Sequence, residues 1–282
     1  MSTEEIVKRV GVVARYDKPD AIKLAGRIRR HLESIPAIED VIFDNDTAAG
    51  LGTGGVPIEE MRADLLIVIG GDGTILRTIQ KLRTQIPILG VNFGGVGFLA
   101  DATPVDAFAM IDQVLTDLKI EERMRLAIHI NGNSLPRATN EAVIVTTMIA
   151  TAPPARMFAF RILVDDHELD CLRADGIVIA TPTGSTAYAM SAGGPIIDPR
   201  VDGVIIVPLA PYKLSSRPWV VCADSKIMVE PIHALEGAAI VIDGQHTQPV
   251  HAGDTIAITK ADEPALFVTT KWQFYERVRS KL

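Results

Sequence analysis

The chain has 282 residues, 48% of them hydrophobic, which is enough apolar material for a sizeable core and favours two domains over one. Its 35 acidic and 28 basic side chains give a formal net charge of −7 at pH 7. Broad nucleic-acid binding needs clustered Lys and Arg to neutralise phosphates, so this acidic balance excludes an extended nucleic-acid footprint. Only a local cationic pocket is compatible with it.

The N-terminal sequence MSTEEIVKRV mixes charged with apolar side chains, and no stretch approaches the roughly 18 apolar residues of a membrane span. We therefore expect no signal peptide, no membrane partner and a cytoplasmic location. The two cysteines, Cys171 and Cys222, are too few for a disulfide scaffold and are expected to be buried, inert thiols. The six histidines show no close pairing of the zinc-ligand type, so no protein-held transition metal is expected.

The first half of the chain alternates strand-like and helix-like segments. Short apolar runs predict strands at 10–14, 41–43, 65–69 and 86–91, while apolar residues at helical spacing predict helices after Pro19, after Gly73 and over 105–118. Alternation of this kind indicates an α/β domain over residues 1–119, with a doubly wound, mostly parallel sheet covered by helices.

Beyond residue 120 the pattern changes to short strands separated by turns. Strands are predicted at 126–130, 143–147, 158–164, 176–180, 203–207, 226–230 and 239–242, with turn sequences at 131–133 and 243–244. This spacing predicts a mainly antiparallel β domain over 120–271. The final segment, 272–282, has Trp272, Tyr275 and Val278 on or near one helical face, and we hypothesise that this helix packs back on the first domain.

Three glycine-rich stretches compete as ligand-binding turns. The sequence GLGTGG at 50–55 satisfies the spacing G-x-G-x-x-G, but several residues separate it from the preceding strand, and Pro57 follows before any long helical pattern. A dinucleotide-binding turn requires strand, tight turn and helix in that order. A flexible loop is therefore the favoured interpretation of 44–57, and its role stays open.

The sequence GGDGT has the required order. Gly70 and Gly71 allow a tight turn, Gly73 allows a phosphate to approach the backbone, and the following helix presents unpaired N–H groups to an anion. It lacks the Gly-Lys-Ser/Thr ending of a P-loop, so the Walker mechanism is not implied. In the alternative interpretation, Asp72 is a turn residue and Thr74 caps the helix. A carboxylate facing a phosphate site is wasteful unless it handles a proton or a metal, which favours a functional Asp72.

The stretch LRADGIVIATPTGSTAYAMSAGGPIIDP, residues 172–199, predicts a strand, a turn and a short helix that begins near Thr186. In the simplest interpretation, Ser185 and Thr186 cap that helix. The hydroxyl residues beside Asp175, Tyr188 and Ser191 suit a polyhydroxylated ligand equally well, because a carboxylate accepts ribose or amide hydrogens. This stretch alone does not separate the two interpretations.

Together these motifs resemble the NAD kinase family, whose members phosphorylate the 2′-hydroxyl of the adenosine ribose of NAD to give NADP. The resemblance rests, in chain order, on GGDGT, LGVNFGGVGFL, NEAVI, ADGIVIATPTGSTAYAMSAGGPI, PLAPYKLSSRP and DGQ. The first block is shared with phosphofructokinases and diacylglycerol-type lipid kinases, whereas the long fourth block is highly diagnostic of NAD kinases.

The resemblance implies a role for each matching position. Asp72 would be the proton acceptor, with Gly71, Gly73 and Thr74 at the phosphates. Phe98 would pack against the adenine, or else serve as a core residue. The residues implied in NAD binding are Asp72, Gly73, Phe98, Asn140, Glu141, Arg173, Asp175, Thr186, Ala187, Tyr188, Ala189, Met190, Ser191, Ala210 and Gln245.

Within this set the two ends of NAD are divided between different residues. The resemblance implies that Asn140 and Glu141 contact the adenosine end and that residues 186–188 line its pocket. Asp175 and Ser191 would face the nicotinamide riboside. It also implies a homodimer or homotetramer.

The chemistry of phosphoryl transfer agrees with these residues. Transfer to a ribose hydroxyl is accelerated mainly by alignment of donor and acceptor and by stabilisation of charge, for which one carboxylate and a glycine cradle suffice. Because no dedicated carboxylate cluster is visible, Mg²⁺ or another divalent cation is expected to arrive with the donor phosphates. The sequence leaves open whether the donor is ATP, another triphosphate or polyphosphate, and whether NADH is accepted.

Two other functions compete. A lipid kinase would share GGDGT and a two-domain plan, but it gives no reason for TPTGSTAY, and the chain shows no basic amphipathic helix. A non-catalytic NAD sensor would bind NAD without transferring phosphate, although an intact motif around Asp72 argues against it. Formation of NADP by the pure protein distinguishes the three functions.

Overall fold

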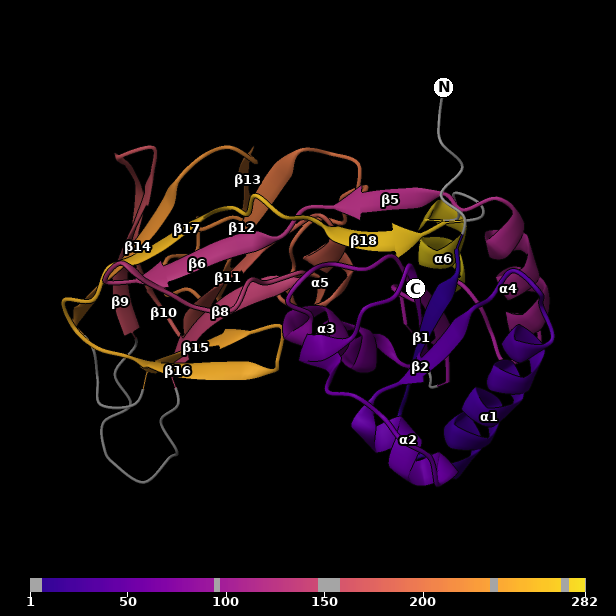
Figure 1. Ribbon diagram of the computed structural model, residues 1–282. Coiled ribbons are helices and arrows are strands. Elements are labelled where there is room, and N and C mark those ends of the chain that lie inside the picture. Colours follow the sequence, from indigo (N-terminus) through magenta and orange to yellow (C-terminus); the bar gives the residue numbers. More distant parts are fainter. Residues whose placement is uncertain (1–6, 94–96, 147–157, 234–237, 270–273, 282) are drawn as a thin grey trace. The chain divides into compact units, whose positions relative to one another are not determined.

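The computed structural model describes residues 7–93, 97–146, 158–233, 238–269 and 274–281. The chain divides into two compact units, Met1–Glu122 with Ala265–Leu282, and Arg123–Pro264. In Figure 1 the first unit begins in indigo and takes up the yellow end of the chain, while the second unit holds the pink and orange segments.

The first unit is built on one six-stranded sheet. Its strands are β1 (Arg9–Ala14), β2 (Asp40–Phe43), β3 (Leu65–Gly70), β4 (Ile88–Asn92), β5 (Ile120–Arg123) and β18 (Ala265–Val268). Their order is β2-β1-β3-β4-β18-β5, and the first five strands of this order pair in parallel. The predicted mostly parallel sheet is confirmed.

Helices cover both faces of this sheet, because neighbouring residues of a strand point in opposite directions. Val10 and Val12 of β1 pack in one apolar cluster with residues of α1 and α4, whereas Leu66 and Val68 of β3 pack in another cluster with α3. Figure 1 shows α1 and α4 to one side of β1 and β2, with α3 to the other. The helices are α1 (Pro19–Glu33), α2 (Asn45–Leu51), η1 (Ile58–Glu60), α3 (Asp72–Lys81), α4 (Ala107–Thr116) and α6 (Phe274–Lys281).

The flexible loop predicted over 44–57 is wrong, because α2 occupies half of it. Asp44 caps this helix by accepting a hydrogen bond from the Thr47 N–H (3.3 Å), and Gly52 ends it with a φ of 67°. The Thr47 hydroxyl oxygen accepts the N–H of Ala14 in β1 (2.7 Å), which fixes the helix on the sheet. These glycines therefore end and pack a helix.

The C-terminal boundary of the second unit also differs from the prediction. Residues 265–268, assigned by their sequence to the β domain, form β18 and pair with β4 of the first sheet through Phe267 and Ile88. The first boundary lies after Glu122 rather than after residue 119. A short apolar run predicts a strand, but it carries no information about which sheet receives that strand.

Helix α6 belongs to the first unit and is bonded to it through Arg277. Arg277 Nη1 donates a hydrogen bond to the Phe98 carbonyl (3.0 Å). Tyr275, predicted near the packing face, is 60% exposed, and Val278 is half-buried. Trp272 lies outside the described residues.

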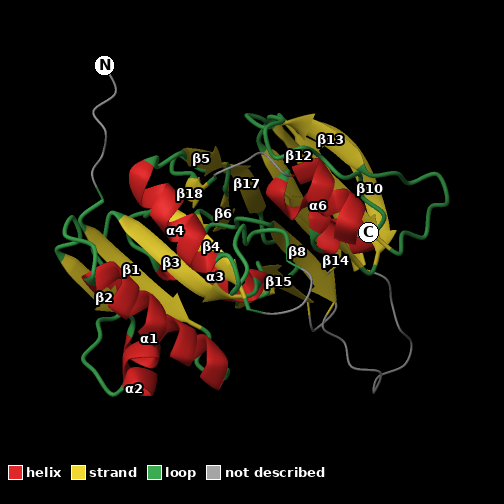
Figure 2. Ribbon diagram, turned by 90° about the vertical axis from the view of Figure 1, so that its right-hand side faces the viewer, coloured by secondary structure: helices red, strands yellow, loops and turns green. Residues whose placement is uncertain are grey.

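The second unit contains two six-stranded sheets whose strand pairs are antiparallel, as predicted. Their orders are β10-β9-β14-β17-β6-β7 and β13-β12-β11-β8-β15-β16, and Figure 2 draws these strands in yellow. The strands are β6 (Leu126–Ile130), β7 (Asn133–Ser134), β8 (Glu141–Thr146), β9 (Phe158–Val164), β10 (His167–Ala174), β11 (Gly176–Ala180), β12 (Gly203–Leu209), β13 (Trp219–Cys222), β14 (Ile227–His233), β15 (Ala238–Ile242), β16 (His246–Val250) and β17 (Ile256–Lys260).

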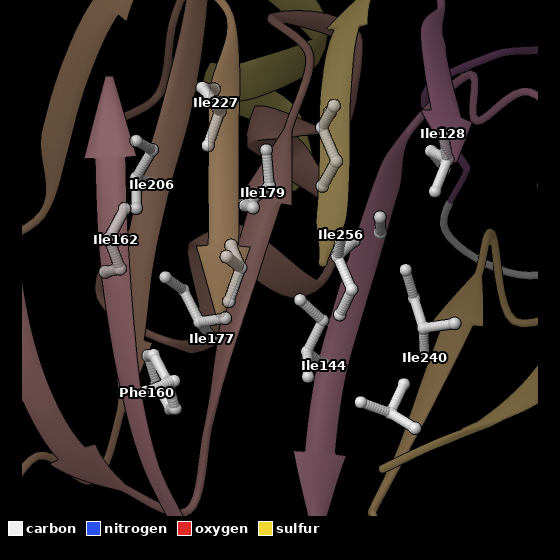
Figure 3. Packing of buried hydrophobic residues seen from close by; sticks show 14 of the residues in the cluster. Ile128, Ile144, Phe160, Ile162, Ile177, Ile179, Ile206, Ile227, Ile240 and Ile256 are labelled. Atoms are coloured by element: carbon white, nitrogen blue, oxygen red, sulfur yellow. The ribbon is translucent and has the colours of Figure 1, made fainter. Parts of the chain in front are cut away.

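The core of this unit joins side chains from both sheets. Phe160, Ile162 and Ile227 come from the first sheet, and Ile144 and Ile177 come from the second (Figure 3). The opposite face of the second sheet is covered as well, by the short helix α5 (Tyr188–Ser191), which follows the 3₁₀ turn η2 (Thr183–Thr186). Burial on both faces explains why β11 is apolar at every position.

Two local predictions in this unit have opposite outcomes. The turns at 131–133 and 243–244 are confirmed, with positive φ angles at Asn131 (51°) and Asp243 (48°). The expectation of buried thiols is wrong, because Cys171 and Cys222 are both exposed. They lie in the edge strands β10 and β13, where alternate side chains face outward.

Candidate functional site

The GGDGT turn joins the buried strand β3 directly to α3. Gly71 is the N-cap, and Thr74 lies inside the helix with its N–H bonded to the Gly71 carbonyl (2.9 Å), so the alternative interpretation of Thr74 as a helix cap is wrong. A Cβ at Gly70 would lie 2.5 Å from Thr74 Oγ1, whereas a Cβ at Gly71 or Gly73 would have no atom of the described residues within 4 Å. Gly70 is therefore required for packing, whereas no described residue fills the space above Gly71 and Gly73.

The Asp72 carboxylate is held by the backbone of a second loop. Its Oδ2 accepts the N–H of Phe98 (2.7 Å) and its Oδ1 accepts the N–H of Leu99 (3.1 Å). A Cβ at Gly97 would lie 2.6 Å from Oδ1, so only glycine allows this approach. Because each carboxylate oxygen has two acceptor positions, Asp72 is oriented and still able to accept a further hydrogen. The block LGVNFGGVGFL thus contains the residues that orient Asp72.

The start of α3 favours an anion. The first N–H groups of a helix lack intrahelical partners, and the helix dipole adds a partial positive charge. Asp72 and Gly73 occupy this first turn. The ring of Phe98, predicted to meet an adenine, has the ammonium of Lys281 5.0 Å from its centroid. Its contact with adenine stays a prediction.

A cavity at the other edge of this sheet is unrelated to the turn. It has a volume of about 650 Å³ and is lined by Arg9, Met61, Arg62 and Arg83, among others, near the first residues of β1, β3 and β4. Ligands of parallel α/β sheets bind beyond the carboxyl ends of the strands, which is where Gly70 ends β3. The turn at Asp72 is therefore the stronger candidate.

In the second unit, a buried carboxylate organises the start of β8. Asp243 accepts the N–H groups of Thr139 (2.8 Å), Asn140 (2.8 Å) and Glu141 (3.0 Å). Burial raises the pKa of Asp243, and these three hydrogen bonds oppose that shift. From the sequence, Asp243 is predicted only to lie in a turn and to match a family motif. The strand pairing of β15 with β8 brings it to residues 139–141.

Asn140 and Glu141 carry buried polar atoms with no hydrogen-bond partner among the residues described. These atoms are Asn140 Oδ1 and Glu141 Oε2. Burial is the main cause that raises the pKa of Glu141 to about 8, and the nearby Asp243 carboxylate raises it further. A hydrogen bond from the Tyr188 N–H lowers the pKa. An unmet buried polar group costs about 1–3 kcal/mol, so both atoms are suited to a ligand.

The TPTGST stretch is clamped onto these residues. The Thr181 N–H donates to the Asn140 carbonyl (2.9 Å), and its hydroxyl donates to the Thr139 carbonyl (2.7 Å). The same hydroxyl accepts the N–H of Gly184 (3.0 Å). A Cβ at Gly184 would lie 2.2 Å from the Asn140 carbonyl oxygen, so this turn requires glycine.

Ser185 and Thr186 are not helix caps, contrary to the simplest interpretation. Both lie in η2, and no side chain caps α5. Ser185 Oγ donates to the Ile197 carbonyl (3.1 Å) and accepts the Ile197 N–H (3.0 Å), which ties the turn to the segment after α5. Thr186 is buried, and Tyr188 is 44% exposed, so its ring remains accessible.

The remaining predicted residues lie in three places of the second unit. The Asp175 N–H bonds to the Leu209 carbonyl (2.9 Å), the Arg173 guanidinium lies 4.4 Å from the centroid of the Tyr212 ring, and Ala210 has a φ of 44°. The side chain of Asp175 is exposed. The others are Ala187, Ala189, Met190 and Ser191 on or beside α5, and Gln245 in the turn before β16.

No group of three His, Cys, Asp or Glu side chains in the described ranges is arranged to hold a metal ion. Within the same ranges, no helix has the length and apolar character needed to cross a membrane.

Two protein-family models match this chain. The ATP-NAD kinase N-terminal domain family matches residues 10–118, and the ATP-NAD kinase C-terminal domain family matches residues 139–270. An NAD kinase of Methanosarcina mazei is 45% identical over 280 residues, which cover 98% of this chain and 94% of that protein.

Two solved structures share the fold. A yeast NADH kinase complexed with NADH superposes with a TM-score of 0.88 at 26% identity, covering 99% of this chain and 88% of that one. An Archaeoglobus fulgidus NAD kinase in complex with ATP superposes with a TM-score of 0.79 at 32% identity, covering 96% and 99%. The chain therefore belongs to the NAD kinase family.

Proposed function

We propose that the enzyme transfers the terminal phosphoryl group of ATP to the 2′-hydroxyl of the adenosine ribose of NAD, with Asp72 as proton acceptor. Membership in the ATP-NAD kinase families and the ATP bound to the Archaeoglobus fulgidus relative support ATP as donor. The observation that carries the role of Asp72 is the position of its carboxylate. Two N–H groups orient it at the first turn of α3, between two glycines above which no described residue lies.

The first unit supplies the groups that act on the phosphates. The donor phosphates would lie over Gly71 and Gly73, with Thr74 close by, and receive hydrogen bonds from the first turn of α3. The ribose hydroxyl passes its proton to Asp72 as its oxygen bonds to the terminal phosphorus, and the bond between that phosphorus and the bridging oxygen breaks to release ADP. A Mg²⁺ ion bound to the donor would neutralise phosphate charge.

A donor-borne cation fits the residues present. The described chain offers no cluster of three metal-ligating side chains, and Mg²⁺ commonly keeps several waters and binds proteins through few carboxylates. We therefore propose that the donor phosphates and water hold most of the coordination positions of the cation.

The second unit supplies the groups that bind NAD. Asn140 Oδ1 would accept a hydrogen bond from the adenosine, and Glu141, protonated at neutral pH because its pKa is about 8, would donate one. The turn at 186–188 would line the adenosine pocket, with α5 beside it. Asp175 and Ser191 would face the nicotinamide riboside.

Four further residues are assigned roles by their match to the family pattern. Arg173 and Ala210, near Asp175, and Gln245 in the turn after β15 are proposed as additional NAD contacts because they match the family pattern. We propose that part of the Phe98 ring contacts the adenine.

The donor is tested with pure protein, NAD and Mg²⁺, to which ATP, GTP or inorganic polyphosphate is added in separate reactions. NADP is quantified by mass spectrometry, with NADH as an alternative acceptor and diacylglycerol as a control acceptor. We expect NADP formation with ATP to exceed that with polyphosphate. A higher rate with polyphosphate overturns ATP as donor, and no NADP with any donor overturns the proposed reaction.

We also propose a cytoplasmic homodimer or homotetramer, on the strength of the family resemblance. Light scattering at the concentration used in the assay measures the state directly. A monomer at that concentration contradicts the proposal.

A further inference from the structure

Helix α6 is attached to the loop that holds Asp72. The guanidinium of Arg277 donates to the Phe98 carbonyl (3.0 Å) and forms an ion pair with Asp101. The two side chains of this pair are 15% and 14% exposed. Solvent-exposed ion pairs contribute little to stability, but this pair is too buried to be one of them. Arg277 therefore anchors α6 firmly on residues 98–101.

The same loop residue faces Asp72 on its other side. The N–H of Phe98 donates to Asp72 Oδ2 (2.7 Å), while its carbonyl accepts from Arg277. Two hydrogen bonds through one residue thus connect α6 to the carboxylate of the GGDGT turn. Both bonds, and the helix itself, belong to the first unit.

Lys281 extends this connection with a positive charge. It follows Arg277 by four residues, so both side chains lie on one face of α6. Its ammonium lies 5.0 Å from the centroid of the Phe98 ring. Burial and the neighbouring Arg277 lower the pKa of Lys281, and the carboxylates of Asp72 and Asp101 oppose that shift.

Lys281 and Arg277 differ in their pairing with carboxylates. Among the described residues, the Lys281 ammonium has no carboxylate oxygen within 4 Å, whereas Arg277 is paired with Asp101. The GGDGT turn lacks the lysine with which P-loops contact the donor phosphates. Transferred phosphoryl groups carry charge on their peripheral oxygens, and a fixed cation stabilises it.

We propose that α6 completes the phosphoryl-transfer site, with Lys281 as a cationic ligand of the donor phosphates and Arg277 as a positioning residue that holds Asp72 through Phe98. The proposal rests on the assignment of Asp72 to the phosphoryl-transfer site. Lys281 acts on the phosphates directly, and Arg277 acts only through the backbone of Phe98.

The role of Lys281 is tested with Lys281→Met, Lys281→Arg and the matched control Arg279→Met, an exposed position of the same helix with the same change in charge. Initial rates give kcat and the KM of ATP and of NAD. We expect Lys281→Met to lower kcat/KM for ATP about ten- to a hundredfold, the effect of one charge-assisted hydrogen bond, with the KM of NAD nearly unchanged. Lys281→Arg should retain most activity, and Arg279→Met should match the wild type.

Two outcomes overturn the role of Lys281. One is a Lys281→Met variant with wild-type kcat/KM for ATP. The other is a Lys281→Met variant more active than the wild type. That result would mean that the lysine side chain shields the Phe98 ring and does not bind the phosphates. A wild-type protein that forms no NADP overturns the proposed function instead, so the two failures are distinguishable.

The role of Arg277 is tested by a double-mutant cycle with Asp72. We expect Arg277→Gln to lower kcat about ten- to a hundredfold, as displacement of a catalytic group does, with both KM values nearly unchanged and partial rescue by Arg277→Lys. In the Asp72→Asn background, Arg277→Gln should have almost no further effect on kcat, because the carboxylate that it positions is absent. Equal losses in both backgrounds overturn the positioning role.

Discussion

Replacement of Asp72 by asparagine keeps the shape of the side chain and removes its charge. If Asp72 accepts the ribose proton, turnover should fall by about 10² to 10⁴, the usual cost of losing a general base. This loss corresponds to roughly 3–5 kcal/mol of transition-state stabilisation. The dissociation constant of NAD should change far less, because the carboxylate acts mainly in the transition state.

The Asp72→Asn change should also lower the stability of the folded protein, because it disturbs two hydrogen bonds. The two carboxylate oxygens of Asp72 accept separate N–H groups, from Phe98 at 2.7 Å and from Leu99 at 3.1 Å. An asparagine offers one acceptor oxygen, and its NH₂ group would face the second N–H donor. We expect a decrease of about 1–3 kcal/mol in the free energy of unfolding. For a protein of this size, each kcal/mol lost from the free energy of unfolding lowers the melting temperature by about 2–4 °C.

Asp64→Asn is the control for charge removal. Asp64 also accepts two backbone N–H groups, from Lys8 and Arg9 at 2.9 Å each, but it precedes β3, whereas Asp72 follows that strand. Turnover at saturating ATP and NAD, the dissociation constant of NAD by calorimetry and the melting temperature are measured for both variants. A folded Asp72→Asn variant that turns over within about threefold of the wild type refutes the proton-acceptor role, because that loss is far below the expected one.

Three further changes test the remaining parts of the site. Asp175→Ala should raise the KM of NAD about tenfold or more in a folded protein, and an unchanged KM removes Asp175 from the site. Gly97→Ala places a Cβ 2.6 Å from Asp72 Oδ1, so turnover should fall while NAD affinity is retained, and unchanged turnover means that the loop adjusts without moving Asp72. Because the folded chain raises the pKa of Glu141 from 4.5 to about 8, its contribution to stability is full below about pH 4.5 and is lost as the pH rises to about 8. The free energy of unfolding, measured with denaturant across this pH range, should decline less for Glu141→Gln than for the wild type. The remaining decline is due to Asp243, and an unchanged decline contradicts the raised pKa of Glu141.

Local patterns were enough to predict most elements that carry the site. The apolar run at 65–69 and the helical spacing after Gly73 correspond to β3 and α3, because strand and helix periodicities are properties of neighbouring residues. The glycines of GGDGT indicated a tight turn because the turn preference of glycine is likewise a local property. In contrast, α2 was missed although Asp44 and Gly52 are ordinary capping residues, since the glycine spacing of that segment drew the interpretation towards a loop.

The contacts that orient the site were decided by the tertiary structure. Asp243 reaches the backbone of residues 139–141, and Asp72 reaches Phe98 and Leu99, across more than twenty residues of sequence in each case. The pairing of β18 with the first sheet and the ion pair of Arg277 with Asp101 join still more distant segments. Sequence periodicity reports which face of an element is apolar, whereas the partner of a carboxylate or of a strand edge depends on which segments the complete fold brings within hydrogen-bond distance.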